Sequence, residues 1–215
     1  KSLHYNNLGD KLYKAANVFD AQTIDELYLR LVSNCSNASN LVLQGYEYPT
    51  LLTHCRPAFD NLNEIEKMMA LDIITYLPDD ILVKVDRAAM GVSLETRVPF
   101  LDHRVIEFAW TLPMSAKYRE NQGKWILRQV LNKYLPKNII DRPKMGFGVP
   151  LADWLRGALR EWAESLLDEN RIRNDGFFDP IPIRQKWSEH LSGQRNWQNH
   201  LWDVLMFQAW LDTHH

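Results

Sequence analysis

Apolar side chains recur at every third or fourth position along most of the chain, which is the spacing of amphipathic α-helices. In the first third, this spacing predicts helices over residues 8–19 and 23–34. Asp20 and Thr23 lie between these segments and can act as helix N-caps. Residues 36–61 contain two prolines and little periodicity. We therefore expect an irregular connection there.

Helical spacing resumes at residue 62 and continues almost to the C-terminus. The sequence "LPDD" at residues 77–80 is expected to end one helix and to cap the next, with Pro78 near the start of the second helix. No convincing strand alternation and no internal repeat is present, so the predicted fold class is mainly α. The predicted helices cover residues 62–77, 79–92, 102–112, 124–135, 151–167, 181–191 and 199–211, the last one apolar on nearly all sides and so expected to be buried.

Composition limits the classes of function. The chain has 215 residues, of which 46% are hydrophobic, and a formal net charge of -2. The absence of a basic excess argues against nucleic-acid binding. No apolar run approaches the ~20 residues that cross a bilayer. Cys35 and Cys55 have neither zinc-ligand nor disulfide-framework spacing, so we expect a cytoplasmic protein. Because the chain begins at Lys1, we also expect it to be a piece of something larger.

Candidate chemistry begins on the predicted helix over residues 79–92. At 100° per residue, one arc of this helix is apolar and is expected to be core. The opposite, polar arc is either a solvated face or one wall of a polar cleft, and the uncharged Val83 and Met90 among its charges weaken the first interpretation. The apolar arc consists of Ile81, Leu82, Val85, Ala88, Ala89 and Val92, and the polar arc of Asp79, Asp80, Lys84, Asp86 and Arg87.

The segment "GVSLETRVPFLDHR" follows this helix. Glu95 and Arg97 alternate with apolar residues in a short extended run before Pro99, which forces the preceding residue out of helical conformation. Asp102 is the predicted N-cap of the next helix. The charged pair is either a buried bridge that organises the corner or a contact with a ligand.

A third candidate is Lys144, in the stretch "IIDRPKMGFGVP" over residues 139–150. Pro143 restricts the backbone, and Gly146 and Gly148 permit tight turns. Lysine is a compact, permanent cation suited to a phosphate or to a developing anion. A surface loop whose lysine faces water is the competing interpretation.

These stretches together resemble one family. The segments "LPDDILVKVDRAAMGVSLETRVPFLDHRVIEFAWTLP", "GKWILRQVLNKYLP" and "IIDRPKMGFGVPLADWL" follow one another as in the C-terminal synthetase domain of glutamine-dependent asparagine synthetases. The resemblance runs from about Asp72 to Leu155, and "NHLWDVLMFQAWL" is similar to the family's terminal helix. Before Asp72 only the helical pattern is similar.

The resemblance implies the helical C-terminal part of an adenine-nucleotide α-hydrolase-like (ATP pyrophosphatase) synthetase domain. Residues 1–71 are then a helical lead-in, residues 72–155 the motif-bearing core and residues 156–215 the C-terminal helices. The implied enzyme adenylates the aspartate side-chain carboxylate with ATP and Mg²⁺ and amidates it with glutamine-derived ammonia. No residue of this chain is assigned as a ligand of the metal. A homodimer is one possible assembly.

The resemblance also implies roles for the candidate residues. The lysine in the position of Lys144 stabilises charge on the intermediate or on pyrophosphate, which agrees with a rigid loop that presents a permanent cation. The remaining candidates line or organise the synthetase cleft. They are Asp80, Lys84, Asp86, Arg87, Glu95 and Arg97.

The chain departs from the family's pattern at its other catalytic motifs. The "SGGxDS" loop that cradles pyrophosphate, the acidic "GEGxDE" segment and the glutaminase cysteine are absent from these residues. We therefore expect the fragment alone to be inactive. Three alternatives stay open: an amidotransferase acting on a sugar or other carboxylic acid in surface-polysaccharide synthesis, a β-lactam-forming relative, and a non-catalytic helical assembly module.

Overall fold

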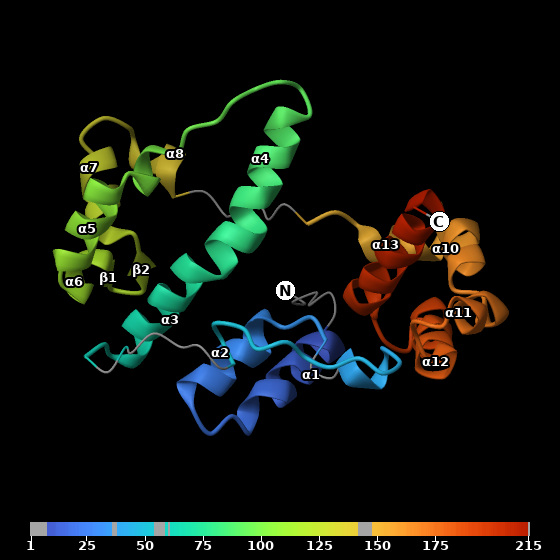
Figure 1. Ribbon diagram of the computed structural model, residues 1–215. Coiled ribbons are helices and arrows are strands. Elements are labelled where there is room, and N and C mark those ends of the chain that lie inside the picture. The colour runs from blue at the N-terminus through green and yellow to red at the C-terminus, as the bar shows by residue number, and fades with distance from the viewer. Residues whose placement is uncertain (1–7, 36–37, 54–58, 60, 142–147, 215) are drawn as a thin grey trace, which may run out of the picture. The chain divides into compact units, whose positions relative to one another are not determined.

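The computed structural model describes residues 8–35, 38–53, 59, 61–141 and 148–214. The described chain is mainly helical, as predicted, and its sheet consists of two short strands (Figure 1). The chain forms two compact units. Unit 1 comprises Lys1–Ile81 and Val149–His215, and unit 2 comprises Leu82–Gly148. None of the described helices is long and apolar enough to pass through a membrane.

The first helices of unit 1 are α1 (Leu8–Phe19) and α2 (Ile24–Val32), close to their predicted bounds. The Thr23 hydroxyl accepts a hydrogen bond from the Glu26 N–H at 3.1 Å, which confirms Thr23 as the N-cap of α2. The prediction that Asp20 also caps a helix is wrong. Its carboxylate instead forms an ion pair with Arg30, in the last turn of α2.

The chain stays helical through the "LPDD" sequence, where a break between two helices was predicted. α3 (Glu64–Ile74) is followed by η2 (Leu77–Leu82), a π-helical turn, and then by α4 (Val83–Met90). A proline has no N–H to donate and its ring crowds the preceding turn. A π-type turn, which is wider than an α-helical turn, is one way for a helix to accommodate such a disturbance. We attribute the π-helical turn η2 to Pro78 for this reason.

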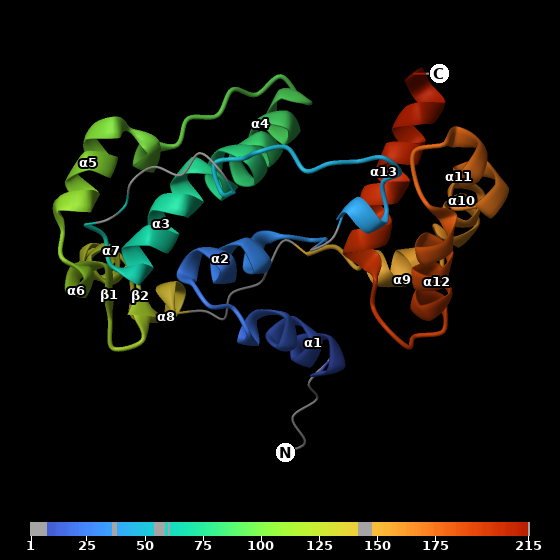
Figure 2. The ribbon, with the colours of Figure 1, turned by 60° about the horizontal axis from the view of Figure 1, so that its bottom comes forward.

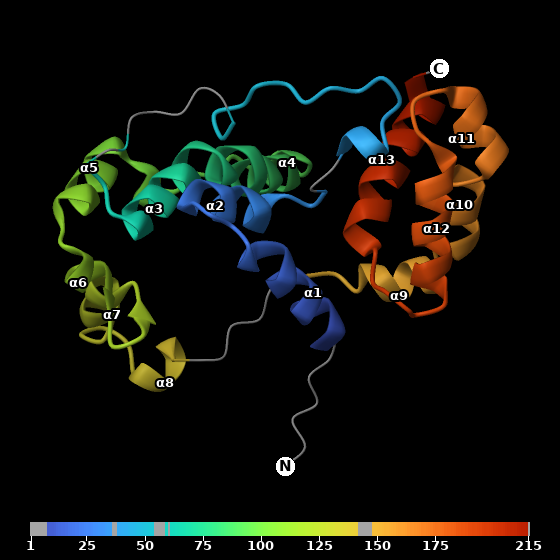
Figure 3. The ribbon, with the colours of Figure 1, turned by 90° about the horizontal axis from the view of Figure 1, so that it is seen from below.

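The helices at the C-terminal end of unit 1 lie together in all three views (Figures 1, 2 and 3). Their shared apolar side chains form the core, including the fully buried Leu155, Leu167, Ile183 and Leu205. α13 was expected to be buried, and five of its residues are. The five helices are α9 (Leu151–Arg156), α10 (Arg160–Leu166), α11 (Glu169–Asp175), α12 (Pro180–Leu191) and α13 (Gln198–His214).

The single helix predicted over residues 151–167 is wrong, because α9 and α10 are separate. The break is at Gly157, whose backbone leaves the helical region. A Cβ atom at this position would lie 3.1 Å from the Asp153 carbonyl oxygen, a contact tighter than most side chains tolerate. Glycine therefore permits the close turn that sends α10 in a new direction.

The irregular connection between α2 and α3 is tied to the C-terminal helices. It contains η1 (Ala38–Asn40), after which Val42 pairs with Phe178 in an isolated antiparallel bridge. The Leu43 N–H donates to the Phe177 carbonyl and the Asp179 N–H donates to the Leu41 carbonyl, both at 2.9 Å. The connection thereby adds Leu41 to the core.

Unit 2 is built from short elements around a two-stranded antiparallel hairpin. The hairpin turn uses Glu120 and Asn121, both with positive φ, as in the tight turns that match strand twist. α7 ends sooner than predicted because residues after Leu131 form turns. Besides α4, the elements are η3 (Pro99–Leu101), α5 (His103–Thr111), α6 (Met114–Lys117), β1 (Tyr118–Arg119), β2 (Gln122–Gly123), α7 (Trp125–Leu131) and α8 (Lys137–Ile140).

No residue among those described in unit 2 is buried. The predicted apolar arc over residues 79–92 was expected to be core, and this is wrong for the part in unit 2. Val85 is 41% exposed and Val92 is 76% exposed. The helix also ends at Met90. The spacing of apolar residues does not by itself supply the partner that would cover them.

Candidate functional site

The polar residues predicted from helical spacing lie on two successive elements. Asp80 is half-buried in η2, at the end of unit 1. Lys84, Asp86 and Arg87 are exposed on α4 in unit 2, and Lys84 and Arg87 are three residues apart and so are neighbours on one helical face. α4 therefore presents two cations together.

A tight reversal follows α4 and sets up the charged corner. The Leu94 N–H donates to the Ala89 carbonyl at 2.9 Å, which satisfies one of the last carbonyls of the helix. Ser93 has a φ of 60°, in the left-handed region that few residues other than glycine adopt. This conformation ends the helix and directs the chain into the extended run that carries Glu95.

The structure brings Glu95 and Arg97 together as an ion pair. Residues two apart on an extended chain point to the same side, so the contact follows from local geometry. The Arg97 side chain is 86% exposed and the Glu95 side chain 69% exposed. The buried-bridge interpretation of this pair is therefore wrong, and the pair contributes little to stability. The ligand-contact interpretation stays a prediction.

Asp102 caps α5, as predicted, by accepting a hydrogen bond from the Arg104 N–H at 2.9 Å. The Arg104 guanidinium also binds both carboxylate oxygens of Asp102, at 2.9 and 2.7 Å. Hydrogen bonds from the Arg104 side chain, and then from its backbone, hold the pKa of Asp102 below its usual value. The sequence did not predict the contact between the Arg104 guanidinium and the Asp102 carboxylate, which requires the Arg104 side chain to fold back towards the N-cap.

Lys144 lies outside the described residues. Asp141, three residues before it, is described and has a side-chain partner on α7. Asp141 accepts a hydrogen bond from Arg128 on α7 at 2.5 Å between Oδ1 and Nη1. Arg128 also donates through Nε to the Gly123 carbonyl at 3.2 Å. The end of α8 is therefore tied to α7 immediately before the lysine stretch. No sequence signal links Arg128 to an acid 13 residues away.

Comparison with known proteins adds the evidence that decides the family. The family model described as asparagine synthase matches residues 1–212. The chain belongs to the asparagine synthase family. The match includes the first 71 residues, for which the sequence motifs showed only a helical pattern. It also confirms the predicted adenine-nucleotide α-hydrolase-like fold class.

Individual relatives carry the same family name. A Mycobacterium tuberculosis protein provisionally named as a glutamine-hydrolysing asparagine synthetase is 37% identical over 68% of this chain and 22% of its own length. The glutamine-hydrolysing asparagine synthetase 1 of Bacillus subtilis is 32% identical over 69% of this chain and 23% of its own length. The human glutamine-hydrolysing asparagine synthetase is 28% identical over 76% of this chain and 30% of its own length.

The chain thus spans about a quarter of the length of the curated relatives it matches. No solved structure matches it. Among the described residues, no three His, Cys, Asp or Glu side chains group around a common point. Cys35 is a half-buried free thiol, and Cys55 lies outside the described residues.

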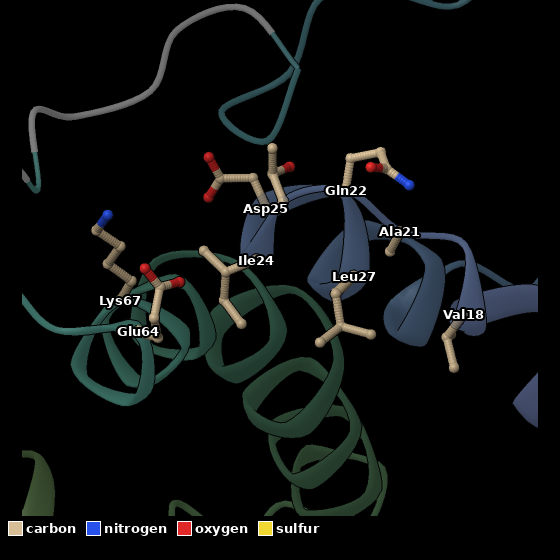
Figure 4. Close-up of a pocket in the computed structure, with 9 residues that line it drawn as sticks. Val18, Ala21, Gln22, Ile24, Asp25, Leu27, Glu64 and Lys67 are labelled. Carbon is tan, nitrogen blue, oxygen red and sulfur yellow. The ribbon is translucent and has the colours of Figure 1, made fainter.

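One surface pocket of about 640 Å³ lies within unit 1 (Figure 4). It opens where the α1–α2 turn meets the start of α3. Ile24 and Leu27 line its apolar side, while Glu64 and Lys67 stand together at the start of α3. None of the predicted site residues lines this pocket.

A second pocket of about 500 Å³ in unit 1 is more polar and includes Arg156 and Arg195. The Arg195 guanidinium lies 3.8 Å from the Trp197 ring centroid and 4.3 Å from that of Tyr13. Such stacking holds a cation on aromatic faces. Nothing in the sequence indicated this stacking, because Tyr13 lies on α1 and Arg195 and Trp197 lie in the loop before α13.

Proposed function

We propose that this chain is the C-terminal helical part of an ATP-dependent, glutamine-hydrolysing asparagine synthetase. The observation that carries the proposal is the family match over residues 1–212, together with the motifs around Glu95, Arg97 and Lys144 in the order expected for the synthetase domain. In the proposed reaction, an aspartate side-chain carboxylate displaces pyrophosphate from ATP. Ammonia from glutamine then attacks the activated carbonyl, and AMP leaves.

The cations of unit 2 fit the phosphate groups of such a substrate. Lys84 and Arg87 are exposed neighbours on α4, and Arg97 is exposed beside Glu95. Arginine binds phosphate oxygens in a forked manner, and lysine acts as a point charge. Lys144 would stabilise the negative charge that develops as pyrophosphate separates. ATP itself supplies the activated phosphorus, and we assign no residue here to Mg²⁺.

The 215-residue chain by itself is expected to hydrolyse neither glutamine nor ATP. Its sequence contains neither the "SGGxDS" phosphate loop nor the glutaminase cysteine of the family. Pyrophosphate exchange into ATP by this chain alone, above the rate of its Lys144→Ala variant, would contradict this expectation.

The first test of the proposed function is Lys144→Ala in the full-length protein. We expect aspartate-dependent pyrophosphate release to fall by about 10²-fold or more, as when one transition-state charge contact is removed. Glutaminase turnover and the melting temperature should not change. Lys137→Ala, which removes an exposed lysine from the nearby α8, is the matched control and should retain full turnover.

Substrate competition completes this test. Aspartate should support pyrophosphate release, and sugar acids at the same concentration should not. Release with sugar acids alone would instead favour the surface-polysaccharide amidotransferase. No release with any carboxylic acid, despite intact ATP binding, would contradict the adenylation chemistry.

A further inference from the structure

Tyr28 on α2 is a buried phenol with two polar partners on α3. Tyr28 as a whole residue is only 2% exposed to solvent. The hydroxyl donates to Asp72 Oδ1 at 2.8 Å and lies 3.2 Å from Thr75 Oγ1. The Thr75 hydroxyl donates to the Leu71 carbonyl oxygen at 2.7 Å, so its oxygen faces the Tyr28 hydroxyl as an acceptor. Three side chains of unit 1 therefore form one small polar network at the end of α3.

This network lies where the helix changes type. Thr75 is the C-cap of α3, with φ −128° and ψ −75°, and the π-helical turn η2 begins at Leu77. The Asp79 N–H, the first donor after Pro78, bonds to the Thr75 carbonyl at 3.0 Å. The position of Thr75 therefore sets the position of the turn that carries Asp80. π-type turns are often found at functional sites.

A carboxylate in the last turn of a helix faces the negative end of the helix dipole, which is unfavourable. For Asp72, which is exposed, water and the hydrogen bond from Tyr28 both offset this. Burial raises the pKa of the Tyr28 hydroxyl, so the phenol keeps its proton and remains a donor throughout the physiological range. Phenylalanine at this position would fill the same space and remove only the donor.

We propose that Tyr28 is a positioning residue of the synthetase: through Asp72 and Thr75 it fixes the start of η2 and thereby the turn that presents Asp80. The role in turnover rests on the proposed function and on the family resemblance that assigns Asp80 to the substrate cleft. The ring of Tyr28 packs between the helices whether or not the hydroxyl is present. The hydroxyl is therefore the group to test.

Hydrogen exchange tests the positioning step without reference to any substrate. Tyr28→Phe in the full-length protein should raise amide exchange at residues 75–82 by about fivefold or more, as one hydrogen bond is lost. The matched control is Tyr76→Phe, which removes a hydroxyl from an exposed side chain at the same junction. Equal exchange in the two variants would overturn the proposal.

A double-mutant cycle then tests the link to Asp80. We expect Tyr28→Phe to lower synthetase kcat by about fivefold to tenfold while glutaminase kcat stays unchanged. If Tyr28 acts through Asp80, Tyr28→Phe combined with Asp80→Asn should be no slower than Asp80→Asn alone. A merely structural role predicts multiplied losses, with both activities and the melting temperature falling together.

Other outcomes are equally decisive. Wild-type synthetase turnover in Asp80→Asn would overturn the proposed link, because Tyr28 would then have no cleft residue to position. Absence of synthetase turnover in the wild-type full-length protein would contradict the proposed function instead. The exchange rates at residues 75–82 would in that case still decide whether Tyr28 fixes η2.

Discussion

His200 lies in the first turn of α13 beside two cations and an aromatic ring. Its ring stands perpendicular to the Trp197 ring, with 5.0 Å between centroids. Nδ1 is buried and has no hydrogen-bond partner among the described residues. Burial, and then the charges of Lys186 and Arg195, lower the pKa of His200. The helix N-terminus also disfavours a positive charge at this position, so the folded protein prefers neutral His200.

This preference predicts a pH dependence of stability. The unfolded chain binds a proton at His200 near the ordinary pKa of about 6.5, whereas the folded chain binds it only at lower pH. Protonation between these two values therefore favours unfolding. We expect the melting temperature to fall as the pH is lowered through about 6.5, and the loss to level off below the folded-state pKa of His200.

The measurement compares melting temperatures of the wild type and His200→Gln between about pH 8 and pH 5. The variant should lose less stability on acidification than the wild type. His103→Gln is the control, because the His103 side chain is 79% exposed. A constant difference between wild type and His200→Gln over the whole range would contradict the assignment.

Helix α3 begins with a capping box, in which Asn63 and Glu66 exchange hydrogen bonds between side chain and backbone. The Asn63 side-chain oxygen accepts hydrogen bonds from the N–H groups of Ile65 and Glu66, at 3.1 and 3.0 Å. The Glu66 carboxylate accepts one in return from the Asn63 N–H at 3.1 Å. This capping box satisfies donors that a helix start otherwise leaves unpaired.

We expect Asn63→Ala to lower the free energy of unfolding by about 1 kcal/mol, because alanine cannot accept these bonds. Urea denaturation checks the change, and Asn61→Ala, at an exposed position in the preceding turn, is the matched control. Equal stabilities of the two variants would show that water replaces the cap without cost.

Local signals in the sequence predicted the elements well where the deciding contacts are themselves local. Thr23 and Asp102 cap their helices through N–H groups two or three residues away. The pair of Glu95 and Arg97 likewise follows from alternation along an extended run. The helix break at Gly157 was missed, because helical propensity tolerates an isolated glycine and the reversal depends on how α10 packs against α9 and α13.

Buried side chains are distributed unequally between the two units of the described chain. The core cluster gathers side chains from α9 to α13, with Leu41 from the α2–α3 connection. Among its members, Trp187 is 1% exposed and donates its indole N–H to Glu164. The described residues of unit 2 contribute no buried side chain. The buried apolar core of the described residues therefore lies in unit 1.

Native-state hydrogen exchange on the 215-residue chain should show this division. We expect the slowest-exchanging amides in α12 and α13, because opening them exposes the core, and faster exchange in α5 and α7. The rates are measured by mass spectrometry of peptic fragments from one sample, so each unit is the control for the other. Amides of α7 as slow as those of α13 would contradict the expectation.

The helical class, most helix positions and the family motifs around Glu95, Arg97 and Lys144 could be predicted from the order of residues alone. These features depend on spacing and on contacts between near neighbours, which a linear sequence records. Which apolar faces are buried, and the contact of Tyr28 with Asp72 and Thr75, 44 and 47 residues away, became visible in the folded chain. Burial and such distant pairings depend on which surfaces meet in space, and the period of a single helix carries no information about its partner.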